Sequence, residues 1–120
     1  MESVYELYTR GSELLEAGDH HAAALSLARA RDLDPEPTSI REALGRALFH
    51  CGRFQEAAAE FDAIVQRAPT NDYALFCLGR ALQLQGRHDD ARKPLALASC
   101  LRPERADYRT YLERARRHAA

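Results

Sequence analysis

Residues 74–103, ALFCLGRALQLQGRHDDARKPLALASCLRP, decide the fold, because their glycine, alanine and proline positions occur twice earlier in the chain at a spacing of 34 residues. These positions form four ladders: Gly11, Gly45 and Gly79; Gly18, Gly52 and Gly86; Ala23, Ala57 and Ala91; Pro35, Pro69 and Pro103. A fixed period of this length indicates stacked copies of one supersecondary unit. The ladders predict repeats at residues 4–37, 38–71 and 72–105 within a single domain, residues 1–120.

Each repeat is predicted to be two helices joined by a turn, because apolar residues recur at helical spacing on both sides of the second glycine ladder. The first glycine ladder is expected to let the two helices approach closely. The second glycine ladder is expected to end each first helix in the left-handed conformation. The proline ladder is expected to end each second helix, since the residue before proline is pushed out of the α region.

Helix starts and the end of the chain carry further signals. Ser3-x-x-Glu6 and Ser39-x-x-Glu42 are predicted to be capping boxes that open first helices. The tail is predicted to form an amphipathic capping helix at residues 104–118, which covers the apolar face of the last repeat. Its apolar stripe consists of Tyr108, Tyr111, Leu112 and Ala115.

A 34-residue unit with this order of residues resembles the tetratricopeptide repeat. The resemblance is carried in the second repeat by Leu44-Gly45, Leu48, Ala57, Phe61 and Pro69, and in the third by Leu78-Gly79, Leu82, Ala91, Leu95, Ala98 and Pro103. It implies an all-α fold, a right-handed α-solenoid of helix-turn-helix repeats with seven helices. The repeat is a scaffold that many unrelated proteins use, so the fold alone does not determine a function.

Composition and motifs argue against an enzyme. The 120 residues carry a net charge of −1, with 46% hydrophobic and 29% charged residues, so no overall charge attracts nucleic acid or a membrane surface. The chain lacks a phosphate-binding loop, a nucleophile elbow and a His-Glu-x-x-His element. The five histidines are interpreted as surface residues; His20 and His21 point about 100° apart on one helix, which makes them poor joint metal ligands. No catalytic residue, metal or cofactor is predicted.

The three cysteines and the N-terminus indicate the compartment. Cys51, Cys77 and Cys100 match neither a disulfide framework nor a zinc site, and are predicted to be reduced thiols. The first residues are acidic, unlike a secretory signal, and no long uncharged apolar stretch could span a bilayer. A cytoplasmic protein with no membrane partner is expected.

The working surface is predicted on the concave face of the solenoid, which first helices line. The residues expected to bind a partner there are Tyr5, Tyr8, Ser12, Glu42, Arg46, Phe49, His50, Tyr73, Phe76, Cys77, Arg80 and Gln83. Aromatic side chains interleaved with arginine are typical of protein-binding surfaces. Two alternatives stay open at this stage: burial of the aromatic residues against the capping helix, or against a second copy of the chain.

Two arginines in this set occupy equivalent positions in neighbouring repeats. Arg46 and Arg80 are therefore expected about one helix spacing apart, ~8–10 Å, where they could grip a carboxylate. Glu42, four residues before Arg46, could instead neutralise it.

The resemblance also suggests a comparison with tetratricopeptide domains that clamp the C-terminal carboxylate of chaperone tails through Lys, Asn and Arg. The five clamp positions here are Tyr8, Ser12, Ala43, Tyr73 and Cys77. None supplies the charge, so no binding by that mechanism is expected. The sequence therefore predicts a scaffold that binds a protein or peptide segment with acidic and apolar residues. The alternative is a self-associating structural module of a larger assembly. Nucleic acid, through the arginine-rich tail, is not expected as a partner.

Overall fold

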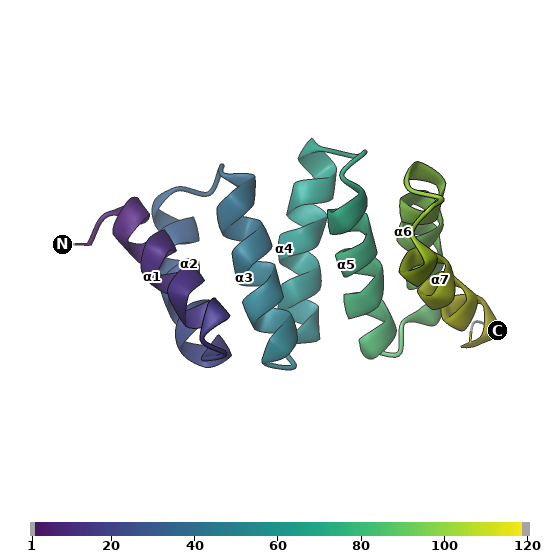
Figure 1. The fold of residues 1–120 in the computed structure, drawn as a ribbon, viewed down its shortest axis with the longest axis horizontal. Coiled ribbons are helices and arrows are strands. Elements are labelled where there is room, and N and C mark those ends of the chain that lie inside the picture. Colours follow the sequence, from purple (N-terminus) through teal and green to yellow (C-terminus); the bar gives the residue numbers. More distant parts are fainter. Residues whose placement is uncertain (1, 119–120) are drawn as a thin grey trace. The chain divides into compact units, whose positions relative to one another are not determined.

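The computed structural model describes residues 2–118, which form seven helices and no strand. In chain order (Figure 1) these are α1 (Val4–Glu16), α2 (His20–Leu33), α3 (Thr38–His50), α4 (Phe54–Arg67), α5 (Asp72–Leu84), α6 (His88–Leu101) and α7 (Ala106–His118). The prediction of an all-α fold with seven helices is confirmed.

The chain divides between Glu60 and Phe61, inside α4, into two compact units. In unit 1, helices α1, α2 and α3 contact one another, and in unit 2 helices α5, α6 and α7 do the same. In unit 1, α2 thus packs against both α1 and α3, and in unit 2, α6 packs against both α5 and α7. The single domain of residues 1–120 stays a prediction.

Glycine ends the first helices as predicted. Gly18, Gly52 and Gly86 have positive φ angles of 84°, 78° and 78°. After Gly18, the amide of Asp19 donates to the carbonyl of Leu14 at 2.9 Å, a bond that closes the end of α1. Residues with a Cβ rarely adopt this backbone conformation, so glycine at this position determines both where the helix ends and the direction of the turn.

Helix starts agree with the sequence at one of the two predicted capping boxes. Ser3 is the N-cap of α1, and its hydroxyl accepts a hydrogen bond from the amide of Glu6 at 3.1 Å. The prediction for Ser39 is wrong, because α3 begins one residue earlier, at Thr38, with Pro37 as its N-cap. Pro37 is extended, with φ −64° and ψ 124°, and the helix starts directly after it, which leaves Ser39 in the first turn.

The first glycine ladder lets paired helices approach closely in both units. A Cβ placed on Gly11 would lie 2.5 Å from Cγ of Leu27, and one on Gly79 would lie 2.5 Å from Cγ of Leu95. Both leucines are fully buried. Each helix pair therefore packs around a leucine that fills the space left by the absent side chain.

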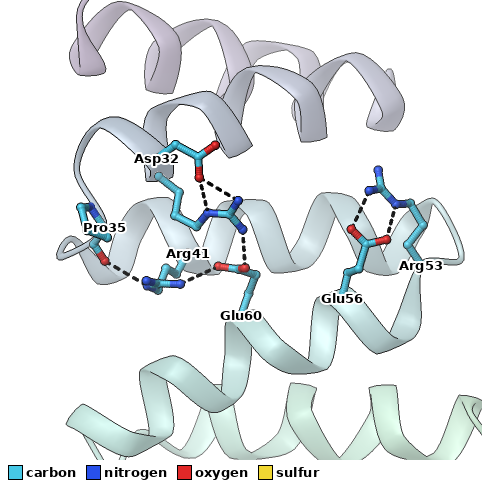
Figure 2. A network of polar contacts seen from close by, with 7 residues as sticks. Asp32, Pro35, Arg41, Arg53, Glu56 and Glu60 are labelled. Atoms are coloured by element: carbon cyan, nitrogen blue, oxygen red, sulfur yellow. Dashed lines mark hydrogen bonds and ion pairs between the residues drawn. The ribbon is translucent and has the colours of Figure 1, made fainter.

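A buried carboxylate joins three helices of unit 1 (Figure 2). Glu60 is 6% exposed; its Oε1 accepts from Nη1 of Arg41 on α3 at 2.9 Å, and its Oε2 accepts from Nη1 of Arg31 on α2 at 2.6 Å. Arg41 also donates to the carbonyl of Pro35. Burial opposes the charge of Arg31, but hydrogen bonds to Asp32 and Glu60 raise its pKa above the ordinary value. Charge pairing thus compensates for the burial of Glu60.

The last helix of unit 2 is fixed by polar bonds as well as by its apolar stripe. Tyr108, Leu112 and Ala115 are buried and Tyr111 is half-buried, as the amphipathic pattern predicts. The hydroxyl of Tyr108 donates to Oδ2 of Asp72 at 2.7 Å, and Nε2 of Gln83 donates to the carbonyl of Tyr111 at 2.7 Å. Burial and the bond to Asp72 raise the pKa of Tyr108. Helix α7 is therefore joined to α5 at two levels.

Candidate functional site

A groove of about 290 Å³ lies between α1 and α3 of unit 1. It brings together several of the residues predicted to face a partner, and its lining consists of Tyr8, Ser12, Leu15, Glu16, Ser39, Glu42, Ala43 and Arg46. Tyr8 packs its ring against the core formed by Leu7, Ala30 and Ile40. The groove thus has an aromatic wall on α1 and charged groups on α3.

The charges of the groove are not paired with each other. Arg46 is exposed, and within residues 2–118 no ion pair joins it to Glu42. Neutralisation of Arg46 by the acid one turn earlier, the alternative that the spacing left open, is therefore not found. Arg46 and Glu42 can both offer their charge to a ligand.

The other predicted residues of unit 1 lie outside the groove lining. Tyr5 is 77% exposed. Phe49 meets the ring of Phe54 edge to face at 5.3 Å, and His50 stacks on His20 at 4.5 Å between ring centres. Phe49 and His50 thus pack against the starts of α4 and α2, at the end of α3.

The histidine pair corrects the interpretation of His20 as a surface residue. His20 is half-buried beneath His50, and 68 residues later His88 is half-buried and stacked on His118 at 4.7 Å. Burial, together with the neighbouring His20 and Arg46, lowers the pKa of His50. Sequence spacing hides these pairs because their members belong to different helices.

In unit 2, three of the predicted residues contact the capping helix α7: Phe76, Arg80 and Gln83. Phe76 stacks on Tyr108 at 4.6 Å and lies 5.6 Å from the ring of Tyr111. The alternative of burial against the capping helix is thus found for Phe76. Gln83, only 7% exposed, bonds to α7 instead of facing a ligand. Tyr73 and Cys77 are half-buried.

Arg80 lies over the ring of Tyr111, with 3.9 Å between its Cζ and the ring centre. The sequence prediction missed two members of this cluster, Tyr111 as a stacking platform and Arg114, whose Cζ lies 4.8 Å from the same ring centre. A signal was present for Arg114, which follows Arg80 at the same 34-residue spacing that separates Arg80 from Arg46. The expected approach of Arg46 to Arg80 involves different units and stays a prediction.

Three further features of the described residues concern metal ligands, thiols and membrane-spanning helices. Across residues 2–118, no three side chains of His, Cys, Asp or Glu come together as metal ligands. In the same range, none of Cys51, Cys77 and Cys100 forms a disulfide. None of the helices in this range is long and apolar enough to cross a bilayer.

Comparison with protein families gives two matches, each covering more than half of the chain. Models described as tetratricopeptide repeat match residues 8–72 and residues 52–115. Together they span residues 8–115, from within α1 to within α7. No curated protein sequence matches the chain.

Solved structures show the same fold at low sequence identity. The Arabidopsis OM64 TPR domain aligns with a TM-score of 0.88 and 17% identity over 97% of this chain and 96% of its own. The first TPR of Spaghetti (RPAP3), bound to the HSP90 peptide SRMEEVD, aligns with a TM-score of 0.87 and 17% identity over 96% of this chain and 91% of its own. MamA AMB-1 aligns with a TM-score of 0.86 and 21% identity over 94% of this chain. The chain spans 62% of that MamA chain.

Proposed function

Because the chain belongs to the tetratricopeptide-repeat family, we propose that it is a protein-interaction scaffold whose α1/α3 groove binds a segment of a partner protein. The observation that supports this assignment is the groove itself, which collects an aromatic side chain and unpaired charges on first helices. Tyrosine and arginine are the residue types that contribute most to binding energy at protein interfaces. Tyr5 on α1 and Phe49 on α3 extend the proposed surface of unit 1 along the same two helices.

Charge reversal at Arg46 tests the groove without disturbing the core. Arg46 is exposed, so Arg46→Glu should leave the thermal midpoint unchanged while it weakens capture of a partner from native lysate. Arg29→Glu is the matched control, since Arg29 is exposed on α2 of the same unit and lies outside the groove. Equal recovery of every protein by the wild type and Arg46→Glu would exclude this groove.

The partner is not expected to be a chaperone tail. The peptide SRMEEVD is bound by the Spaghetti domain, but the clamp positions of this chain hold Tyr8, Ser12, Ala43, Tyr73 and Cys77. None of these side chains carries a positive charge that could pair with a terminal carboxylate. Titration of fluorescent SRMEEVD should give no saturable change in anisotropy. Saturable binding that survives amidation of the C-terminus would indicate a different mode on the same scaffold.

Self-association is the second candidate, and an apolar groove between α6 and α7 favours it. This groove encloses about 690 Å³ and is lined in part by Ala96, Cys100 and Leu112, while Leu97 and Leu101 on α6 are 43% and 40% exposed. Contiguous exposed apolar surface is typical of interaction sites. Light scattering across a hundredfold dilution separates the candidates. A constant monomer mass would leave self-association without support, and a dimer abolished by Leu101→Glu would establish it.

A further inference from the structure

Two arginines share one aromatic ring in unit 2. The guanidinium groups of Arg80 on α5 and Arg114 on α7 lie over Tyr111 at 3.9 and 4.8 Å from its ring centre. A guanidinium that stacks on an aromatic face keeps its N–H groups at the edge, free to bind a ligand in the plane of the fork. Tyr111 therefore holds two positively charged donors at one place.

Within residues 2–118, no carboxylate forms an ion pair with this positive charge. Along residues 2–118, neither Arg80 nor Arg114 forms an ion pair, whereas other arginines bind carboxylates, for example Arg53 with Glu56 and Arg87 with Asp90. Burial and the charge of Arg114 lower the pKa of Arg80. Two like charges near one ring repel each other, and a bound anion would relieve that repulsion.

The site is held in place before any ligand arrives. Nη1 of Arg80 donates to Oε1 of Gln83 at 3.0 Å, and Nε2 of the same buried amide donates to the carbonyl of Tyr111. Gln83 thus couples the position of the arginine on α5 to the position of the ring on α7. Groups that are already ordered lose less entropy when they bind, which strengthens binding at the site.

We propose that Arg80 and Arg114 form, around Tyr111, a binding site for a carboxylate group carried by a Glu or Asp side chain of the partner segment. The inference rests on the proposed function, because the carboxylate is carried by the partner segment. It specifies which chemical group of that segment unit 2 binds. Both arginines project from mid-helix, away from the starts of α5 at Asp72 and α7 at Ala106. The main-chain N–H groups of a helix N-terminus, which favour phosphate, are therefore remote. Two planar forks match the two oxygens of a carboxylate.

The test uses the full chain and the peptide acetyl-hexaglutamate, with acetyl-hexaglutamine as the neutral probe. In NMR spectra of the arginine side chains, hexaglutamate should produce saturable shifts of the Nε–Hε signals of Arg80 and Arg114, and hexaglutamine should produce none. Arg53 and Arg87, which have acidic partners, serve as internal controls. Equal, non-saturating shifts of all exposed arginines would mean general screening and would overturn the proposal.

Variants separate the site from the total charge of the chain. Arg80→Gln and Arg114→Gln should each raise the Kd for hexaglutamate about tenfold, the usual effect of losing a hydrogen bond to a charged group. Arg92→Gln on α6 removes an equal charge and should leave the Kd unchanged. Tyr111→Phe keeps the stacking ring and should retain binding. An equal rise of the Kd in Arg92→Gln would contradict the carboxylate assignment. Displacement of hexaglutamate by phosphate but not by acetate at equal ionic strength would contradict it too.

The same variants distinguish this inference from the proposed function. Arg46→Glu should lose the partner and keep hexaglutamate binding, because its charge lies in the α1/α3 groove of unit 1. If the wild type does not bind hexaglutamate while its capture of the partner still depends on Arg46, the carboxylate site is overturned and the proposed function is not.

Discussion

The α1/α3 pair of unit 1 and the α5/α7 pair of unit 2 are equivalent helices 68 residues apart, but they present different surfaces. The first pair encloses a groove with Ala43 in its lining. At the position equivalent to Ala43, α7 carries Tyr111, whose ring lies against Phe76 and beneath Arg80. Two positions thus account for the contrast between an open groove and an aromatic cluster with two arginines: Tyr111 stands in place of Ala43, and Arg80 in place of Ser12.

The two units also differ in how their helices are joined. Unit 1 uses the buried Glu60 between Arg31 and Arg41, whereas unit 2 uses the bonds from Tyr108 to Asp72 and from Gln83 to the Tyr111 carbonyl. A charged network depends strongly on every member, because a single deletion leaves buried charge without a partner. Neutral donors are more tolerant. The effects of substitutions should follow this difference.

The largest effect is expected at Glu60. Glu60→Ala leaves Arg41, 15% exposed, without its carboxylate and Arg31, 28% exposed, with Asp32 alone. The free energy of unfolding should fall by about 3–5 kcal/mol. Glu56→Ala, one turn earlier on the same helix (Figure 2), removes an exposed partner of Arg53 and should cost at most about 1 kcal/mol. Urea unfolding measures both, and similar losses would refute a special role for the buried network.

The next effect should be alike in the two units. Gly11→Ala and Gly79→Ala each place a Cβ 2.5 Å from a buried leucine, so strain should exceed the gain in helix propensity and cost about 1–2 kcal/mol. Thermal and urea unfolding of the two variants give the comparison. A stabilised protein in either case would show that Leu27 or Leu95 can move aside.

A smaller effect is expected at the hydroxyl that joins α7 to α5. Tyr108→Phe removes the bond to Asp72 and should lower stability by about 1–2 kcal/mol. Tyr5→Phe is the matched control, because this ring is 77% exposed and should tolerate the loss of its hydroxyl. Chemical denaturation of the pair isolates the buried bond, and equal stability of both variants would show that the bond contributes nothing.

The smallest effect concerns pH in unit 1. The pKa of His50 is lowered in the folded protein. As the pH falls through the ordinary histidine pKa, the unfolded chain therefore binds more protons than the folded protein does. Stability is therefore full above that value and decreases below it. The urea midpoint should decrease when the pH is lowered from 7.5 to 5.5, and His50→Gln should make this decrease smaller. An unchanged pH dependence in the variant would exclude His50 as its source.

Backbone requirements made most of the fold predictable. The residues of the glycine and proline ladders meet local requirements of the backbone, such as the left-handed turn at Gly18 or the close approach of helices opposite Leu27. A local requirement restricts the residue type at one position and is therefore visible in the sequence. The prediction failed at Ser39 because α3 begins directly after the extended Pro37, without a side-chain cap.

The candidate site was only partly predictable because it depends on side chains of separate helices. Repeat spacing predicted one surface for Tyr8, Ser12, Glu42 and Arg46, since it identifies which helices are neighbours, and these four residues line one groove. It could not show that Tyr111 would take up Phe76 and Arg80, or that His20 would stack on His50. Those contacts depend on side-chain size and direction.

Partner capture by Ala43→Tyr tests the central claim most directly, because it places in the α1/α3 groove the residue that occupies the equivalent position in unit 2. The control is Ala59→Tyr, on an exposed position of α4. Both variants, checked for folding by circular dichroism, would be compared with the wild type by affinity capture from native lysate and quantitative mass spectrometry. We predict that the wild type and Ala59→Tyr recover the same partner and that Ala43→Tyr loses it at least tenfold (~1.4 kcal/mol). Equal recovery by all three proteins would contradict the groove as the binding site.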